Sequence, residues 1–380
     1  MRYNKALNSL REKSVSRFFL SEGFMQKTKR SAISRNLFTI ITLAFCAGVL
    51  IYFLRTEEGL KSLRHIFFHL QPVWLLWIAV GIIAGWFLEA YVLHLFCRHL
   101  NKSWKFGQSF YVGMLGLLYS ALTPFNMGEP MEIYNINKMG MDLGTSSSII
   151  AVKSLVHHGV TFIYSLVLIA FELDYFQTRV SNFSFITLFG LVTNSIFIFL
   201  VLIFMINERL TESMLHGVAR FLDKIKLHRL SEKFYDGVHG ELMKFHDSSK
   251  RIGRSFQLYF WAIVLTLVQI TIASLISYFV YRSFGLRGES VFIMVAADTF
   301  VTMVASFVPL PGSSGGAEGG FYLFFREFFG ISIIPAITLW RISTYYVNIL
   351  FGSIVVYFGR KKYRIEKDPR PEEEEKETPD

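Results

Sequence analysis

Long apolar runs limit the fold of this chain more than any other feature. Six of them are about long enough for a helix to cross the ~30 Å hydrocarbon core of a bilayer, which takes about 20 apolar residues. They cover residues 37–54, 73–96, 147–171, 183–206, 256–281 and 334–358. Only 18% of the 380 residues are charged, against about 25% in soluble domains. The sequence therefore predicts an all-α polytopic membrane protein.

Two further apolar regions are interrupted by residues that break regular structure. Residues 108–124 lead into TPFNMGEPMEIYNINKMG, and residues 291–308 lead into PLPGSSGGAEGGFYLFF. Irregular backbone at membrane depth is tolerated only inside protein or beside a water-filled cavity. We therefore interpret the regions 108–140 and 289–330 as two re-entrant hairpins, which gives six to eight transmembrane helices in all. The alternative is that both regions are full spans.

The basic residues predict how the chain is oriented and divided. The first 36 residues contain nine Lys or Arg, and the connector 207–255 contains ten against seven acidic residues. Positive segments remain on the cytoplasmic side of a membrane. This places both termini in the cytoplasm of a multi-pass cell-membrane protein, provided that each hairpin enters and leaves on one side. The net charge of +10 then reflects contact with anionic headgroups and not with nucleic acid.

Three regions follow from these patterns. Residues 1–36 are expected to form a basic cytoplasmic arm, and residues 37–360 the membrane domain. Within that domain, 207–255 has apolar residues at helical spacing with basic residues between them, which predicts an amphipathic cytoplasmic connector. Residues 361–380, basic and then rich in Glu and Pro, are expected to be a disordered cytoplasmic tail.

The membrane domain shows a weak internal symmetry. The order span, hairpin, span occurs at 73–171 and again, in the opposite orientation, at 256–358. Inverted repeats whose broken helices meet near the bilayer midplane are common in transporters, where they form the substrate site. We therefore predict an inverted repeat with a central site.

The two hairpins contain similar motifs, in which proline leads through glycine to glutamate. Glycine lets another backbone or a ligand approach closely, and an exposed helix N-terminus offers N–H groups to an anion. The plain alternative is that both segments are interfacial turns. The candidate residues in these motifs are Pro124, Gly128, Glu129, Pro130, Pro309, Pro311, Gly312, Gly316 and Glu318.

Ionisable residues inside the predicted spans are the second group of candidates, because charge is costly in hydrocarbon. Lys153 and Arg341 occupy equivalent places, each on the span that follows a hairpin. We expect both to neutralise a lipid phosphate, which arginine can hold with two hydrogen bonds. Alternatively, Lys153 extends to the inner interface. Glu129, Glu318 and Asp298 are candidates for carrying coupling protons.

Motifs of soluble catalysis are missing from the sequence. It contains no P-loop, no GxSxG and no HExxH, and its two cysteines form no cluster with histidine. We therefore predict no cofactor, no metal site and no ATP hydrolysis.

The hairpin motifs, together with AVKSLVHHG and LWRISTYYVNILFG, resemble those of a flippase-like integral membrane family. Its type member is the membrane region of lysylphosphatidylglycerol synthase, the multiple peptide resistance factor. The resemblance covers about residues 37–360 and implies a lipid-binding or lipid-translocating module. Many members have arginine where this chain has Glu132 and Lys153, which leaves the headgroup open. The resemblance also implies a stand-alone member without the aminoacyl-transferase domain, so lysyl transfer is not predicted.

The sequence thus predicts a flippase that binds an anionic phospholipid or lipid-linked headgroup in an intramembrane cavity. Its partners would be membrane lipids, and the sequence does not fix its oligomeric state. Two alternatives stay open. One is a membrane-embedded enzyme acting on a lipid-linked sugar or phosphate. The other is a membrane subunit that recruits a soluble lipid-modifying enzyme.

Overall fold

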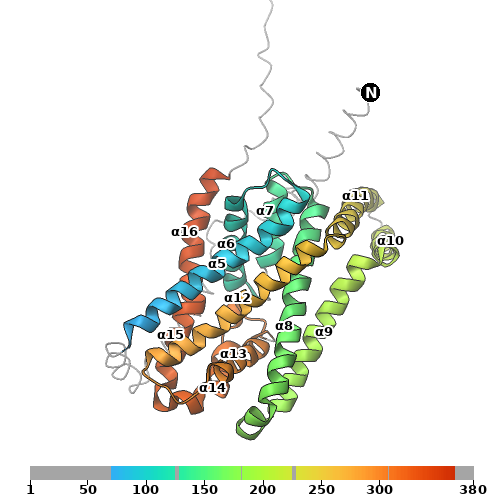
Figure 1. Cartoon of the computed structure of the whole chain (residues 1–380). Coiled ribbons are helices and arrows are strands. Elements are labelled where there is room, and N and C mark those ends of the chain that lie inside the picture. Colours follow the sequence, from blue (N-terminus) through green and yellow to red (C-terminus); the bar gives the residue numbers. More distant parts are fainter. Residues whose placement is uncertain (1–69, 125–127, 181, 225–227, 307, 364–380) are drawn as a thin grey trace, which may run out of the picture.

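The computed structural model describes residues 70–124, 128–180, 182–224, 228–306 and 308–363. In these residues the chain forms helices and contains no strand (Figure 1). The all-α polytopic fold predicted from the sequence is confirmed. The basic arm, the predicted span 37–54 and most of the tail lie outside the described residues.

Four long apolar helices match the predicted spans. They are α5 (Pro72–Leu100), α8 (Leu143–Arg179), α9 (Phe183–Ile206) and α12 (Phe256–Ser283). A fifth apolar stretch, Pro311–Gly359, is also long enough to cross a bilayer. It contains the predicted span 334–358, which the structure divides into α15 (Ile333–Arg341), a π-helical turn (Ile342–Tyr346) and α16 (Val347–Lys362).

Each interrupted region forms a pair of short helices. The first pair is α6 (Phe106–Leu122) and α7 (Gly128–Lys138). The second is α13 (Val291–Ala305) and α14 (Gly316–Phe329), with a 3-10 turn at Pro311–Ser313 between them. The two hairpins enter the bundle from opposite ends (Figure 1). That arrangement is the one expected of an inverted repeat.

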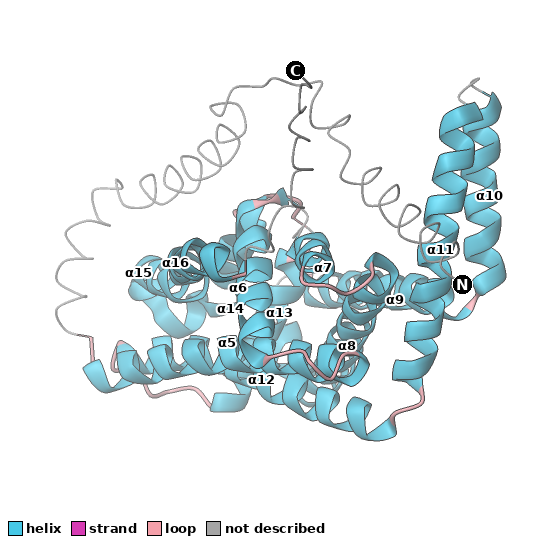
Figure 2. Ribbon diagram, turned by 90° about the horizontal axis from the view of Figure 1, so that it is seen from above, coloured by secondary structure: helices cyan, strands magenta, loops and turns pink. Residues whose placement is uncertain are grey.

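The first helices of the two halves, α5 and α12, run antiparallel along each other (Figures 1 and 2). A hydrogen bond joins the start of α5 to the end of α12, where the N–H of Gln71 donates to the carbonyl of Ser283 at 2.9 Å. Along their length, the amide of Gln269 on α12 reaches Glu89 on α5. The two halves are therefore in contact from one end of the bundle to its interior.

Two hydrophobic cores fill opposite ends of the bundle. One surrounds α13 and α14 and is rich in phenylalanine, with Phe176, Phe300 and Phe321 among its buried members. The other surrounds α6 and α7 and includes Phe96, Ile149 and Ile252. Each hairpin thus has its own core, and the long helices α5, α8 and α12 contribute to both.

The connector forms two helices, α10 (Glu208–Lys224) and α11 (His228–Gly253). The end of α11 packs on the start of α8, where the N–H of Gly144 donates to the Glu241 carboxylate at 2.6 Å. The Ser148 and Ser249 hydroxyl groups are 2.8 Å apart in the same contact. The α10–α11 pair stands at one corner of the bundle (Figure 2).

Candidate functional site

A buried ionic cluster lies at the first hairpin. The Lys153 ammonium on α8 is 2.6 Å from a carboxylate oxygen of Glu89 on α5 and 2.7 Å from one of Glu132 on α7. Gln269 on α12 donates to the other oxygen of Glu89 at 2.8 Å. Lys153 and Glu132 are buried, and Glu89 is mostly so. Side chains from four helices therefore form this cluster, and three of these helices meet at the ammonium group.

Two glycines let α7, the second helix of the first hairpin, pack closely against α6. A Cβ on Gly116 of α6 would collide with the Glu132 carboxylate. A Cβ on Gly128, the first residue of α7, would collide with the Gly116 carbonyl and the Ser120 hydroxyl. Glycine is needed at Gly128, because the carbonyl that a Cβ would meet is backbone and cannot move aside. At Gly116 a Cβ would displace the Glu132 carboxylate from its present position. The first motif thus sets the position of Glu132 as well as that of Glu129.

Glu129 lies one turn before Glu132 on α7 and has a neutral partner. The hydroxyl of Ser154 on α8 donates a hydrogen bond to its carboxylate. Glu129 is half-buried, and no cation pairs with it among the residues described here. The first hairpin therefore brings two glutamates against two consecutive residues of α8.

The second hairpin contains a simpler ion pair. The guanidinium of Arg341 on α15 makes two parallel hydrogen bonds with the Glu318 carboxylate on α14, both 2.8 Å long. Both side chains are buried or nearly so. This fork-to-fork geometry is the strongest way in which arginine binds a carboxylate. Arg341 is also followed directly by the π-helical turn, a distortion that is frequent at functional sites.

Side chains hold the tip of the second hairpin through hydrogen bonds to its backbone. Gly312 and Gly315 have positive φ angles of 57° and 85°, which glycine adopts without strain. The carbonyl of Gly312 accepts from Arg341 at 3.2 Å, and the N–H of Gly315 donates to Glu318 at 2.6 Å. The Arg341–Glu318 pair therefore holds the loop at both Gly312 and Gly315.

Tyr345 links the two hairpins. Its hydroxyl donates to the carbonyl of Ala121 at the end of α6, at 3.0 Å. A Cβ on Gly312 would collide with the Tyr345 ring. The inner end of the first hairpin thus lies against the tyrosine that also packs on the tip of the second.

The structure places the remaining predicted residues as follows. Asp298 on α13 is buried and accepts a hydrogen bond from the Ser277 hydroxyl. Gly316 begins α14, where a Cβ would collide with Val308. The four prolines flank the hairpin tips, with Pro130 and Pro309 exposed and Pro124 and Pro311 half-buried. Lys153 does not extend to the interface, because its ammonium is held inside by two carboxylates.

Three members of the first cluster were not among the predicted binding residues, although Glu89 is an ionisable residue inside a predicted span. Glu89 and Glu132 neutralise Lys153, and Gln269 ties Glu89 to the other half of the molecule. A signal existed for Glu132, which is three residues after Glu129 and so shares its helix face. No signal pointed to Gln269, since its partner lies 180 residues away.

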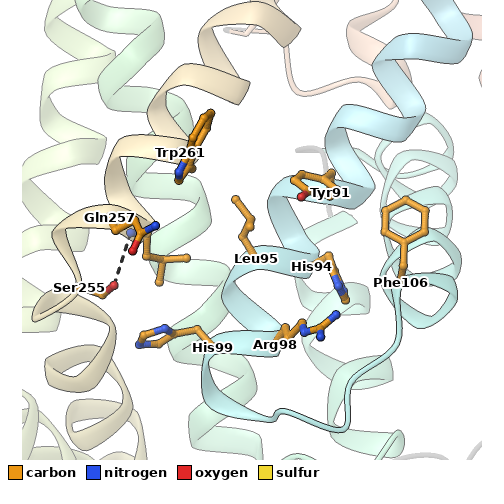
Figure 3. A pocket seen from close by; sticks show the side chains of 10 residues that line it. Tyr91, His94, Leu95, Arg98, His99, Phe106, Ser255, Gln257 and Trp261 are labelled. Atoms are coloured by element: carbon orange, nitrogen blue, oxygen red, sulfur yellow. Dashed lines mark hydrogen bonds between the residues drawn. The ribbon is translucent and has the colours of Figure 1, made fainter.

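An open groove of about 530 Å³ lies between the end of α5 and the start of α12 (Figure 3). His99 points towards the start of α12, and Arg98 lies beside His94 (Figure 3). Tyr91, Phe106 and Trp261 supply aromatic walls. The groove has no carboxylate in its lining. It therefore offers positive charge beside aromatic surface, a combination typical of a membrane interface.

Residues 37–352 match the family described as the lysylphosphatidylglycerol synthase TM region. The chain belongs to this family. The match covers all described helices up to the first part of α16, including both hairpins. The family assignment and the predicted resemblance agree.

A relative in Archaeoglobus fulgidus, described as a UPF0104 membrane protein, is 27% identical over 315 residues. The alignment covers 78% of this chain and 90% of the relative. The similarity therefore extends over most of a second membrane protein, whose description names no substrate.

Proposed function

We propose that this protein binds a phosphate-bearing lipid headgroup between its two hairpins and moves the lipid from one leaflet to the other without ATP hydrolysis. One observation carries the proposal. Each hairpin has a glutamate on its second helix that pairs with a cation on the helix that follows, as Glu132 does with Lys153 and Glu318 with Arg341. The hairpins have opposite orientations (Figure 1), as inverted repeats of transporters do.

The ion pairs suggest how a headgroup binds. A buried ion pair is costly to form and adds little net stability, because desolvation offsets the attraction between its charges. A phosphate group can replace the carboxylate as the partner of arginine, with the same two parallel hydrogen bonds. In our proposal the headgroup takes Arg341 from Glu318, and this exchange frees the hairpin tip that Arg341 and Glu318 hold closed.

The groove beside α5 supports a path from one leaflet. Arg98 and His99 line it together with Trp261. Basic residues attract anionic headgroups at a membrane surface, while aromatic rings lie at the level of the headgroups. We therefore assign the groove as the place where the headgroup is first held. The family relationship to a lysylphosphatidylglycerol synthase membrane region agrees with a lipid substrate.

The test is lipid translocation in proteoliposomes. Purified wild-type protein is compared with Glu318→Gln and Arg341→Ala, using fluorescent anionic and zwitterionic phospholipids. Arg326→Ala is the matched control, because Arg326 is an exposed arginine on α14. We expect translocation by wild type and by the control, and at least a tenfold loss in the two site variants. If folded wild type moves none of the lipids, the proposal is wrong.

A second candidate function is recruitment of a soluble lipid-modifying enzyme. Leu210, Met214 and Val218 form an exposed apolar stripe on α10. A neighbouring face of α10 is buried, as Thr211 and Leu215 show. Replacing the stripe with Gln distinguishes the two functions, because recruitment needs the stripe and translocation at the hairpins does not.

A further inference from the structure

The first hairpin cluster holds more negative than positive charge. Glu89 and Glu132 both lie within 2.7 Å of the Lys153 ammonium. With both carboxylates ionised, the three side chains carry a net charge of −1. An unbalanced charge is strongly unfavourable when it is removed from water. In the second hairpin, by contrast, Glu318 and Arg341 balance each other.

Among the residues that the structure describes, no neighbouring lysine or arginine balances this excess. The titratable groups that act on the cluster are Glu129 on α7, His157 on α8 and Cys97 on α5. Glu129 adds further negative charge. From α12 the contact is the neutral amide of Gln269, and from α6 it is made by glycines. His157 is the one group here that could supply a positive charge, and no carboxylate forms an ion pair with it in the described structure.

We propose that the Glu89–Lys153–Glu132 cluster binds one exchangeable proton, shared between the two carboxylates, and that a second proton, taken up when a lipid phosphate displaces Glu132 from Lys153, couples lipid movement to a proton gradient. The shared proton brings the cluster to neutrality and leaves each carboxyl group in contact with Lys153. The coupling rests on the proposed function, whereas the binding of the proton does not.

Exchange at Lys153 gives the coupling its stoichiometry. When a lipid phosphate takes the place of Glu132 at the ammonium, Glu89 stays held by Gln269 and the shared proton stays on the two carboxyl groups. The remaining carboxylate no longer has enough positive charge beside it, so a second proton is taken up from the water on the side to which the site is open. When the lipid leaves, Glu132 pairs with the ammonium again and the second proton returns to water. One proton is thus carried for each phosphate charge.

Infrared spectroscopy tests the proton directly. A protonated carboxyl group absorbs infrared light at a different frequency from a carboxylate, and its band shifts in D₂O. In protein with isotope-labelled glutamate at neutral pH, we expect one such band from glutamate in the wild type. We expect Glu132→Gln or Glu89→Gln to remove it, because either change leaves one carboxylate for one ammonium. Asp174→Asn, which alters an exposed carboxyl on α8, should leave it unchanged.

Two results would overturn the proton site. The first is a wild-type spectrum without a protonated glutamate band, which needs no variant to fold. The second is a band that persists in both amide variants. If His157 supplies the balancing charge instead, the band is missing from the wild type and appears in His157→Gln.

The coupling has a separate readout. In proteoliposomes that translocate lipid, an imposed proton gradient should change the rate in wild type at least threefold and leave Glu132→Gln unaffected. If the protonated glutamate band is present but the proton gradient does not change the translocation rate, the coupling is wrong and the proton site stands. A protonated band without any translocation would overturn the proposed function and leave the proton site standing.

Discussion

At the scale of residues, the pair Arg341–Glu318 gives the sharpest prediction. Glu318→Gln leaves the buried guanidinium without its counter-charge, so we expect a loss of about 3–5 kcal/mol in the free energy of unfolding. The double variant Arg341→Met with Glu318→Leu removes both charges, and apolar replacement of a buried pair is often neutral or stabilising. We therefore expect the double variant to be more stable than Glu318→Gln. Denaturant unfolding in mixed micelles measures both.

The same pair also separates stability from function. Because the double variant keeps the packing and removes the cation, we expect it to be folded and inactive in lipid translocation. A double variant as unstable as Glu318→Gln would show that the pair contributes through its hydrogen bonds to Gly312 and Gly315 more than through charge balance.

At the scale of elements, glycine contacts fix the first hairpin. We expect Gly128→Ala to lower the free energy of unfolding by about 1–3 kcal/mol, because the added methyl meets a backbone carbonyl that cannot move aside. Gly159→Ala is the matched control in α8, since a Cβ there meets nothing within 4 Å. Alanine is the better helix former, so the control should be equal or up to about 1 kcal/mol more stable. Equal losses in both variants would contradict the close contact of α6 and α7.

The contact of α11 with α8 gives a second prediction at this scale. A Cβ on Gly144 would collide with the backbone carbonyl of Glu241. We expect Gly144→Ala to separate the end of α11 from α8 and to increase amide hydrogen exchange in 241–253 at least tenfold, because open segments lose their protection. Exchange in α5 serves as the internal reference. Unchanged protection in α11 would show that α8 and α11 are held by other contacts.

At the scale of the whole molecule, the hairpins decide the topology. If each is re-entrant, Ser103→Cys and Lys138→Cys react with an impermeant maleimide from one side of the membrane. Arg287→Cys and Ile331→Cys then react from the other side. All four positions are exposed. If each region instead crosses the membrane once, as a single full span, the two members of each pair react from opposite sides.

The labelling needs a protein without other reactive thiols. The chain has two cysteines, Cys46 and the buried Cys97, and both are replaced by alanine first. Reaction of Ser103→Cys from the cytoplasmic side would support the orientation predicted from the basic residues. Reaction from the outer side would reverse it.

Much of the architecture could be predicted from the sequence because its signals are local. The apolar runs predicted α5, α9 and α12 to within four residues at each end, since about 20 apolar residues are needed to cross a bilayer wherever they occur. The prediction for α8 ended eight residues too early. The proline and glycine residues that interrupt the other two runs predicted the two helix pairs, because such residues end helices locally. The connector 207–255 forms two helices, α10 and α11, a division that the prediction of an amphipathic segment did not specify.

The candidate site was less predictable, because it depends on partners that are distant in sequence. Arg341 and Glu318 were both named, but their pairing with each other was not expected. The roles given to the predicted residues in binding phosphate and protons stay predictions. Glu89 and Gln269 lie 180 residues apart, and nothing in either local sequence indicates the other.

The sequence by itself determined that the chain is an all-helical membrane protein with two broken apolar regions, because hydrophobicity and helix-breaking residues act over a few turns. Only the tertiary structure decided which charges neutralise each other. Three helices bring Glu89 and Glu132 to Lys153, and a fourth holds Glu89 through Gln269. The second pair needs only two helices, which bring Glu318 to Arg341. The balance of charge in a buried site depends on distances of a few ångströms between separate helices, and helical periodicity places residues only along their own helix.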